Sequence, residues 1–395
     1  MIYISVVVLN YNYARFLPTA INSALTQTHS AVEVIVVDDA STDDSLAVIE
    51  GFGDSITPVL HERNLGQGAA INSGAAAATG DVVWFLDADD ALLPEACATA
   101  VAAFEADQRL SKFHTPLAVI DGKGRWNGTT LPANPQRLAV GDMSEHVLKF
   151  RAHGWPPMSG NAYSAGALSR VLPVPAESYR QAADSFLNEQ TAICGPMARS
   201  DLPVAAYRRH GANQFADQPI TLEWLRTKID RELCSHEHLG LVAWQLLLTD
   251  YRHNQDDVMD VAFLGYRLAS LRLDPQGHGE IPSVGADTRI GLAENGIRAA
   301  FRNPQLAWSD RVLRTLWFAA VAAVPRVGVV PLLGWYLPDG PSQPIWRRIG
   351  PRAKDRGTRW TLLVQPADPP GGSEDEMDMN SEKSERNGEH DGRTG

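Results

Sequence analysis

Short apolar runs alternate with helical patterns along the first 110 residues of the chain. The apolar runs read as strands buried on both faces of a sheet, and they lie at residues 5–9, 32–37 and 82–86. The segments between and after them that have the spacing or composition of helices are residues 14–26, 45–50, 69–78 and 95–107. This alternation predicts an α/β fold with an open, mainly parallel sheet and helices on both faces.

The later part of the chain has a different pattern. Residues 222–272 carry long helical periodicity and predict an all-helical region. Residues 316–337 are more apolar still, but Pro325, Arg326 and Pro331 interrupt them, so a straight membrane-spanning helix is not expected. Residues 341–360 then hold six bases against one acid, which suits either contact with an anionic membrane or the solvated surface of a buried helical hairpin.

Acidic residues follow two of the predicted strands directly. Asp38 and Asp39 end the second apolar run, and Asp87, Asp89 and Asp90 end the third. The carboxyl ends of parallel strands meet at one edge of a sheet, so both groups are expected to face one cleft. Burying these carboxylates without partners would be costly, and hard oxygen ligands suit Mg²⁺ or Mn²⁺. A divalent cation that holds a phosphorylated ligand is therefore predicted there.

Composition narrows the class of protein. The chain of 395 residues is 44% hydrophobic and 21% charged, as expected of a globular protein. Its net charge of −12 argues against nucleic acid as a partner, although half of this excess lies in the last thirty residues, where a disordered tail is predicted. Cys97, Cys194 and Cys234 lack paired spacing and predict reduced thiols. With no signal-peptide pattern at residues 2–12, a cytoplasmic location is expected.

An ordered series of short motifs runs through roughly the first 215 residues. It consists of residues 5–12 (Ser-Val-Val-Val-Leu-Asn-Tyr-Asn), 23–28 (Ser-Ala-Leu-Thr-Gln-Thr), 34–43 (Val-Ile-Val-Val-Asp-Asp-Ala-Ser-Thr-Asp), 64–66 (Asn-Leu-Gly), 72–74 (Asn-Ser-Gly) and 80–90 with Pro94, and more weakly 159–161 (Ser-Gly-Asn), 183–184 (Ala-Asp) and 207–213 (Tyr-Arg-Arg-His-Gly-Ala-Asn). The series resembles family 2 glycosyltransferases of the GT-A fold, and as an ordered set it is far more specific than any single motif.

The resemblance implies a site for a nucleotide-sugar donor, commonly UDP-linked. Asp39 matches the acid that hydrogen-bonds the nucleotide base. Asp87 and Asp89 match the Asp-x-Asp signature, in which Asp89 binds the metal and Asp87 contacts the ribose or the metal, while Asp90 supports them. Other residues that match donor-binding positions are Leu9, Tyr11, Asn64, Gly66, Asn72 and Ala88.

Asp184 matches the general base of the family, although many relatives have an acidic pair where this chain has Ala183 before Asp184. The alternative is that Asp184 caps a helix N-terminus. His210 matches a segment that in several GT-A enzymes closes over the diphosphate and supplies a metal ligand, and a solvated cationic loop is the alternative there. Trp155 and Asn161 lie where contacts to the acceptor or the donor sugar are expected.

The resemblance implies a metal-dependent, inverting glycosyltransferase that acts on a cell-surface glycan or a lipid-linked acceptor. The Gln-x-x-Arg-Trp motif of processive relatives does not occur, so transfer of one or a few sugars is expected. Two alternatives stay open: a catalytically silent scaffold for glycan assembly, and a nucleotidyltransferase. The latter is disfavoured, because residues 10–15 replace its Gly-rich basic loop.

Four regions are predicted. They are a GT-A catalytic domain at residues 1–215, a helical appendage at 216–305, an apolar and basic segment at 306–360 that is a candidate for contact with the cytoplasmic face of the inner membrane, and a disordered acidic tail at 361–395.

Overall fold

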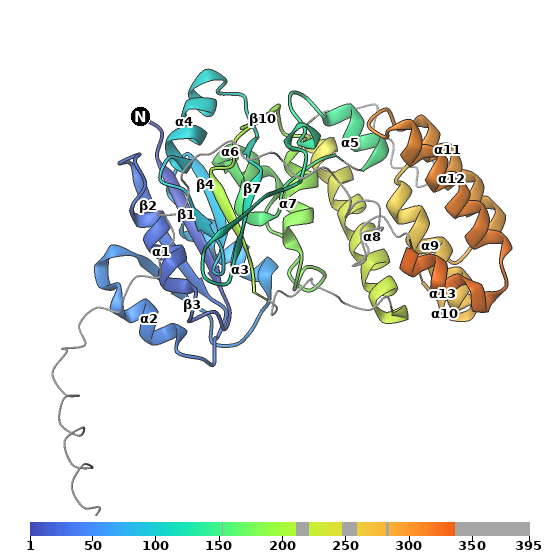
Figure 1. The fold of residues 1–395 in the computed structure, drawn as a ribbon, viewed down its shortest axis with the longest axis horizontal. Helices are drawn as coiled ribbons and strands as arrows, with labels where there is room; N and C mark the ends of the chain where they lie inside the picture. The colour runs from blue at the N-terminus through green and yellow to red at the C-terminus, as the bar shows by residue number, and fades with distance from the viewer. Residues whose placement is uncertain (152, 211–220, 247–258, 282–283, 336–395) are drawn as a thin grey trace, which may run out of the picture.

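A seven-stranded sheet forms the centre of the structure, a computed structural model that describes residues 1–151, 153–210, 221–246, 259–281 and 284–335 (Figure 1). Its strand order is β10-β6-β9-β4-β1-β2-β3, and only β9 runs antiparallel to its neighbours. The strands are β1 (Ile4–Asn10), β2 (Val32–Asp38), β3 (Thr57–Leu60), β4 (Val82–Asp87), β6 (Lys112–His114), β9 (Asn161–Ser164) and β10 (Met197–Arg199). The predicted mainly parallel sheet is confirmed.

Alternate residues of the central strands point to opposite faces, and each face is covered by its own helices. Val6 and Val8 belong to a core cluster with α1, α2 and α4, whereas Val7 and Leu9 belong to a second cluster with α3, α5, α6 and α7. Both clusters are buried, which explains why β1 is apolar at nearly every position. The helices are α1 (Leu17–Leu25), α2 (Ser45–Gly51), α3 (Gln67–Ala77), α4 (Ala96–Ala106), α5 (Ser144–Phe150), α6 (Ala165–Val171) and α7 (Ala183–Thr191).

The strand register brings the carboxyl ends of three strands level. Leu9 of β1 pairs with Asp87 of β4, and Asn10 pairs with Asp38 of β2. β2 and β3 follow β1 on one side of it in the sheet, whereas β4, the next strand of this sheet along the chain, lies on the opposite side of β1. The strand order therefore reverses between β1 and β4. Such a reversal leaves a crevice above the carboxyl ends of the strands, where ligands bind in open α/β sheets.

A smaller four-stranded sheet lies beside this edge, in the order β5-β11-β7-β8. Its strands are β5 (Ala91–Leu92), β7 (Leu117–Asp121), β8 (Trp126–Leu131) and β11 (Ala205–Arg209). β11 pairs with β5 through Ala205 and Ala206, and β5 begins directly after Asp90. This pairing carries residues 207–210 back to the acidic cluster although they are more than 110 positions away in the sequence.

The described residues after the second sheet form six helices, five of which (α8, α9, α11, α12 and α13) contribute to a third core cluster that includes Trp317 and Phe318. The first of these helices, α8, also contributes Leu239 and Val242 to the cluster under the large sheet, so it belongs to both cores. The helices are α8 (Leu222–Gln245), α9 (Val261–Leu273), α10 (Pro275–Gly279), α11 (Arg289–Arg302), α12 (Trp308–Ala323) and α13 (Arg326–Trp335). The helical prediction for residues 222–272 holds where those residues are described.

The predicted four-region division stays a prediction. The third cluster contains residues on both sides of residue 305, such as Ala300 and Trp317. The basic stretch 341–360 and the predicted tail 361–395 lie outside the described residues. Within the described part of the chain, no helix combines the length and apolarity needed to cross a membrane.

Two helix glycines allow a test of this packing. A methyl group at Gly296 of α11 would lie within 2.2 Å of the buried Phe318 ring, whereas one at Gly166 of α6 would meet nothing within 4 Å. Gly296→Ala is therefore expected to destabilise the protein by about 1–3 kcal/mol through overpacking. Gly166→Ala, the matched control, should stabilise it by about 0.5–1 kcal/mol, since alanine is the better helix former. Denaturant unfolding measures both, and an equal response of the two variants would contradict this packing.

Candidate active site

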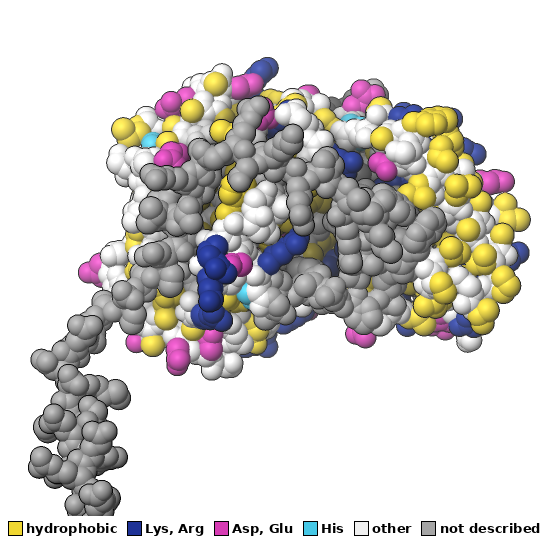
Figure 2. Space-filling view, viewed as in Figure 1, with side chains coloured by type: hydrophobic (Ala, Val, Ile, Leu, Met, Phe, Trp, Pro, Cys, Tyr) yellow, Lys and Arg dark blue, Asp and Glu magenta, His cyan; other side chains and the backbone are white. Residues whose placement is uncertain are grey.

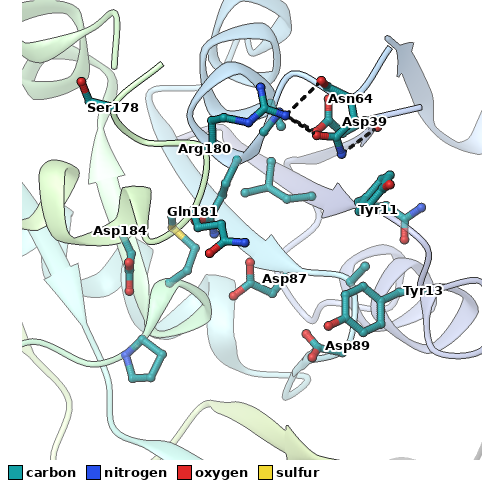
Figure 3. Close-up of a pocket in the computed structure, with 18 of the residues that line it drawn as sticks. Tyr11, Tyr13, Asp39, Asn64, Asp87, Asp89, Ser178, Arg180, Gln181 and Asp184 are labelled. Atoms are coloured by element: carbon teal, nitrogen blue, oxygen red, sulfur yellow. Dashed lines mark hydrogen bonds between the residues drawn. The ribbon is translucent and has the colours of Figure 1, made fainter. Parts of the chain in front are cut away.

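A cavity of about 640 Å³ lies at the carboxyl ends of β1, β2 and β4. Figure 3 shows Tyr11, Asp39 and Asn64 on one side of it, Asp184 on the opposite side, and Asp87 between them. Of the residues proposed from the sequence, those that line the cavity are Leu9, Tyr11, Asp39, Asn64, Gly66, Asp87, Ala88, Asp89 and Asp184. The fold thus brings nine of the predicted positions to one cavity.

The two acids that end β2 have different surroundings. Asp38 is buried away from the cavity, where Oδ1 accepts hydrogen bonds from Asn10 Nδ2 at 2.7 Å and Ser41 Oγ at 2.6 Å. Asp39 lines the cavity. Its Oδ1 lies 2.7 Å from His61 Nδ1, and its Oδ2 accepts from the backbone N–H of Gly66 at 2.7 Å. Asp38 therefore fixes the strand end, and Asp39 holds the following loop against the cavity.

Gly66 is needed for this loop by both its backbone conformation and its surroundings. Its φ of +90° lies in the region that favours glycine, and a Cβ atom there would lie 2.7 Å from the Cα of Arg180. Arg180 closes over the same loop by donating from Nη2 to Asn64 Oδ1 at 2.7 Å (Figure 3). The wall of the cavity is therefore formed by two segments that lie 116 residues apart in the sequence.

The carboxyl groups at the end of β4 repel one another. Burial raises the pKa of the Asp87 carboxyl well above its usual range, and the negative charges of Asp89 and Asp184 raise it further. A hydrogen bond from the Gln67 side chain opposes this shift in the pKa of Asp87. Gln67 Oε1 also accepts from the backbone N–H of Ala183 at 3.0 Å, so one side chain links Asp87 to the helix that carries Asp184.

Asp90 is a supporting residue, as the sequence suggests. Burial and the charges of Asp89 and Asp87 raise its pKa well above the usual range. Its Oδ2 accepts from Ser159 Oγ at 2.6 Å, and its Oδ1 accepts from the backbone N–H of Arg208 at 2.8 Å. Arg208 Nε in turn donates to the backbone carbonyl of Asp89 at 2.7 Å. These contacts fix the turn that presents Asp89 to the cavity.

His210 lies next to Asp89, with Nε2 3.0 Å from Asp89 Oδ2. It follows directly after β11, whose pairing with β5 brings it there, and it lines a smaller hollow beside the main cavity with Tyr13 and Phe16. The remainder of its motif, residues 211–213, lies outside the described residues. The Asp-x-Asp signature and His210 are thus in direct contact.

Asp184 lies in the first turn of α7 on the cavity wall. Burial raises the pKa of its carboxyl, whereas a hydrogen bond from the Ser185 backbone and the charges of Lys228 and Arg231 lower it. The alternative that Asp184 caps the helix is wrong, because the N-cap position is Ala182 and Asp184 lies two residues further on. The Asp184 side chain lines the cavity, and its Oδ1 also accepts the backbone N–H of Ser185 in the first turn at 3.0 Å.

Besides His210, three predicted contacts are not among the residues that line the cavity. Asn72 forms reciprocal hydrogen bonds with the backbone of Val174, at 2.9 and 2.8 Å, so its amide is committed to holding α3 against the loop after α6. Asn161 is fully buried, and its Nδ2 donates to backbone carbonyls that include Pro157 O at 2.9 Å. Trp155 packs against the ring of His153. Pro157 and Met158, between these two, line the cavity instead.

Several lining residues were not predicted from the sequence. Gln67 directly follows the Asn-Leu-Gly motif, and this position is the signal that could have identified it. Arg180 and Arg231 carry no motif. Arg231 lies on α8, whose apolar periodicity predicts only core packing, yet it lines the cavity with Thr227 and donates from Nε to Ser178 O at 3.1 Å. The region predicted as an appendage therefore completes the cavity wall.

A second cluster of potential metal ligands lies outside this cavity. Ligand atoms of Glu232, His236 and Asp260 all lie within 4.8 Å of one another. Among the described residues, this is the one group of three or more His, Cys, Asp or Glu residues that is so closely spaced. Burial lowers the pKa of the adjacent Arg151 guanidinium to about 10, while the carboxylates of Glu189, Asp260 and Glu232 favour its charged form. His236 Nε2 lies 3.9 Å from Glu232 Oε2 and 3.8 Å from Asp260 Oδ2, so the histidine ring is the group nearest to both carboxylates.

Comparison with known proteins identifies the family. The family model described as "Glycosyl transferase family 2" matches residues 5–154. An uncharacterised glycosyltransferase of Nostoc sp. is 41% identical over 216 residues, which cover 53% of this chain and 66% of that protein. A putative glycosyltransferase of Bacillus subtilis is 35% identical over 155 residues, or 38% of this chain and 43% of its own length. The chain thus spans less than two thirds of these relatives.

The fold has a counterpart among solved structures. Residues 1–349 of S. aureus TarS superimpose with a TM-score of 0.50 at 17% identity, covering 84% of this chain and 90% of that one. A further structure of the same protein in complex with UDP gives the same TM-score at 15% identity. The shared architecture confirms the predicted GT-A fold followed by a helical region. Residues 5–154 therefore form a domain of glycosyltransferase family 2.

Proposed function

We propose that this protein transfers a sugar from a nucleotide-sugar donor to a hydroxyl group of a cell-surface glycan or lipid-linked acceptor, with inversion and without processive extension. The observation that carries the proposal is the order in which the acidic residues lie along one cavity. Asp39 lies at one end, Asp87 and Asp89 lie at the centre, and Asp184 lies at the other end. This order matches the base, the diphosphate and the reacting sugar of an extended donor.

The nucleoside is proposed to bind near Tyr11, Asp39 and Asn64. Both oxygens of Asp39 already accept protein hydrogen bonds, but a carboxylate has about four acceptor positions, so it can still accept an N–H from a base. Tyr11 is 37% exposed at the cavity edge and offers a ring for the base to pack on. A UDP-linked donor is favoured because the S. aureus relative of the same fold was crystallised with UDP.

A divalent cation, Mn²⁺ or Mg²⁺, fits the centre of the cavity. Asp87 and Asp89 provide hard oxygen ligands, and His210 provides a nitrogen beside them. The pKa of Asp87 is raised by burial and then by the charges of Asp89 and Asp184, and a cation bound there would favour the ionised carboxylate. When bound, such a cation supplies Lewis-acid stabilisation of the charge on the departing diphosphate.

Asp184 is proposed as the general base. It accepts the proton of the acceptor hydroxyl while that oxygen forms a bond to the anomeric carbon. The bond from the anomeric carbon to the donor phosphate breaks, and its electron pair leaves with the nucleoside diphosphate. Attack from the side opposite the leaving group inverts the anomeric configuration. Met158, Thr227 and Arg231 form the nearby wall on which an acceptor would lie.

The proposed location is the cytoplasm. All three cysteines are free thiols in the structure, which suits a reducing compartment. Nucleotide sugar, metal ion and acceptor would then meet on that side of the membrane.

Substitution of the central acids tests the mechanism. The protein is incubated with Mn²⁺ and a panel of nucleotide sugars, and release of the nucleoside diphosphate is followed. Asp89→Ala and Asp184→Asn are each expected to lower kcat by roughly 10²–10⁴-fold, because one removes cation binding and the other the proton acceptor. Asp54→Asn, an exposed acid outside the cavity, is the control. Turnover that survives either cavity substitution would refute the assigned roles.

The pH dependence follows from Asp184. Because its pKa is raised and the base must be ionised, kcat/KM should fall as pH decreases through a value above the usual Asp range of about 4. Arg231 lowers this pKa, so Arg231→Gln should move the acid limb to higher pH, and Arg231→Lys should leave it near the wild-type position. An acid limb that does not respond to Arg231→Gln would argue against Asp184 as the base.

The pH dependence of protein stability should reflect the raised pKa of Asp87. A carboxyl whose pKa is higher in the folded protein than in the unfolded chain contributes stability at low pH that is lost as pH rises through the folded-state value. In EDTA at pH 8, Asp87→Asn should therefore raise Tm. Each kcal/mol gained in the free energy of unfolding should raise Tm by on the order of 2–4 °C. The increase in Tm should become smaller as the pH is lowered toward 5. Adding Mn²⁺ should raise Tm of the wild type more than that of the variant. A lower Tm for Asp87→Asn in EDTA would contradict this account.

A further inference from the structure

Helix α12 is apolar on two opposite sides. Trp317, Phe318 and Val321 point into the third core cluster and are almost fully buried. Trp308 and Leu316 lie on another side of the helix and are 68% and 61% exposed. A helix at the surface of a globular protein ordinarily has one apolar stripe, so the second stripe is not needed for packing within the helical region.

The exposed stripe is part of a larger surface. The ring of Phe301, at the end of α11, makes an edge contact with Trp308, with ring centroids 5.7 Å apart. Val327 is 87% exposed and lies at the start of α13, the helix that follows α12 directly and packs against it. We call this surface the α12 face, and its exposed members are Phe301, Trp308, Val312, Leu316, Val327 and Val330. Figure 2 shows hydrophobic side chains gathered at the end of the molecule where α11 and α12 lie. An exposed apolar surface of this kind marks an interaction site.

The region that contains the α12 face is positively charged, whereas the whole chain is negatively charged. The described residues 289–335 hold six Arg and two Asp or Glu, a net charge of +4 in a chain of net charge −12. Among the described residues, Arg289, Arg298 and Arg302 are exposed on α11, and the acids there are fewer than the bases. The α12 face is therefore an apolar surface within a basic region.

We infer that the α12 face docks on an anionic lipid bilayer. Trp and Leu side chains bury favourably at the boundary between headgroups and acyl chains, and nearby arginines contribute by attraction to anionic headgroups. Trp308 and the long Arg side chains suit this boundary, because each has an apolar part and a polar end. The helix lies along the surface, since none of the described helices is long and apolar enough to cross it.

The charge distribution favours a bilayer over a second copy of the chain. A two-fold dimer through the α12 face would place the same surface of each subunit against its copy. The exposed arginines of α11 would then be brought together with their own symmetry mates, which is unfavourable unless acids pair with them. An anionic bilayer complements both the apolar stripe and the basic surroundings.

Vesicle binding tests the inference. The full chain is sedimented with vesicles of phosphatidylcholine alone or of phosphatidylcholine with phosphatidylglycerol. Binding is expected only to the anionic vesicles and should weaken as salt is raised.

The triple variant Trp308→Ser, Leu316→Ser, Val327→Ser should lower the vesicle partition coefficient about tenfold or more. The control triple variant Leu46→Ser, Leu202→Ser, Trp244→Ser removes three exposed apolar side chains elsewhere and should bind as wild type.

Three results would overturn the inference. They are absence of wild-type binding to anionic vesicles, equal binding by the α12-face variant, and a dimer in solution that the α12-face variant dissociates. Thermal unfolding of both triple variants checks that these exposed substitutions leave the fold intact. The test is independent of sugar transfer, because Asp89→Ala should bind vesicles as wild type does, so failure of the proposed function and failure of membrane docking give different results.

Discussion

The burial of several carboxyl groups at one edge of the sheet is the constraint on which this structure depends. Burial raises the pKa values of Asp87 and Asp90 well above the ordinary range, and the charge of Asp89 raises both further. A sheet edge can hold such groups together because its strands are fixed by register and by two buried cores. The backbone of Arg208 donates to the Asp90 carboxyl, its guanidinium donates to the Asp89 carbonyl and interacts with the charges of both acids, and Gln67 binds Asp87. These contacts hold the acids in place at the cavity.

Helix α8 connects the catalytic cavity with the helical region. Its N-terminal half packs in the third core, its C-terminal half packs under the large sheet, and Thr227 and Arg231 lie on the cavity wall. The charge of Arg231 lowers the pKa of Asp184. The same helical core supports the α12 face on its outer side. Docking of the α12 face on a bilayer would therefore fix the position of the cavity relative to the membrane, where a lipid-linked acceptor would lie.

Much of the sheet could be predicted from the sequence, and the cavity could be predicted in part. The runs that became β1, β2 and β4 are apolar because both faces are buried, and the acids at their ends mark the cavity edge. The second sheet was harder, since its strands are two to six residues long and one of them contains Gly128. Arg180 and Arg231 reach the cavity only through tertiary packing, which local patterns do not encode. Asn72 belongs to a motif, yet its amide serves the fold.

Where the metal ion binds decides the central claim, since the described residues contain two acidic clusters that could hold it and only one of them lies in the cavity proposed for the donor. Crystals of the full chain soaked with Mn²⁺ and UDP can be measured for anomalous scattering at the manganese absorption edge. The account predicts a peak between Asp87, Asp89 and His210, next to the diphosphate. A peak at Glu232, His236 and Asp260, with none in the donor cavity, would contradict it.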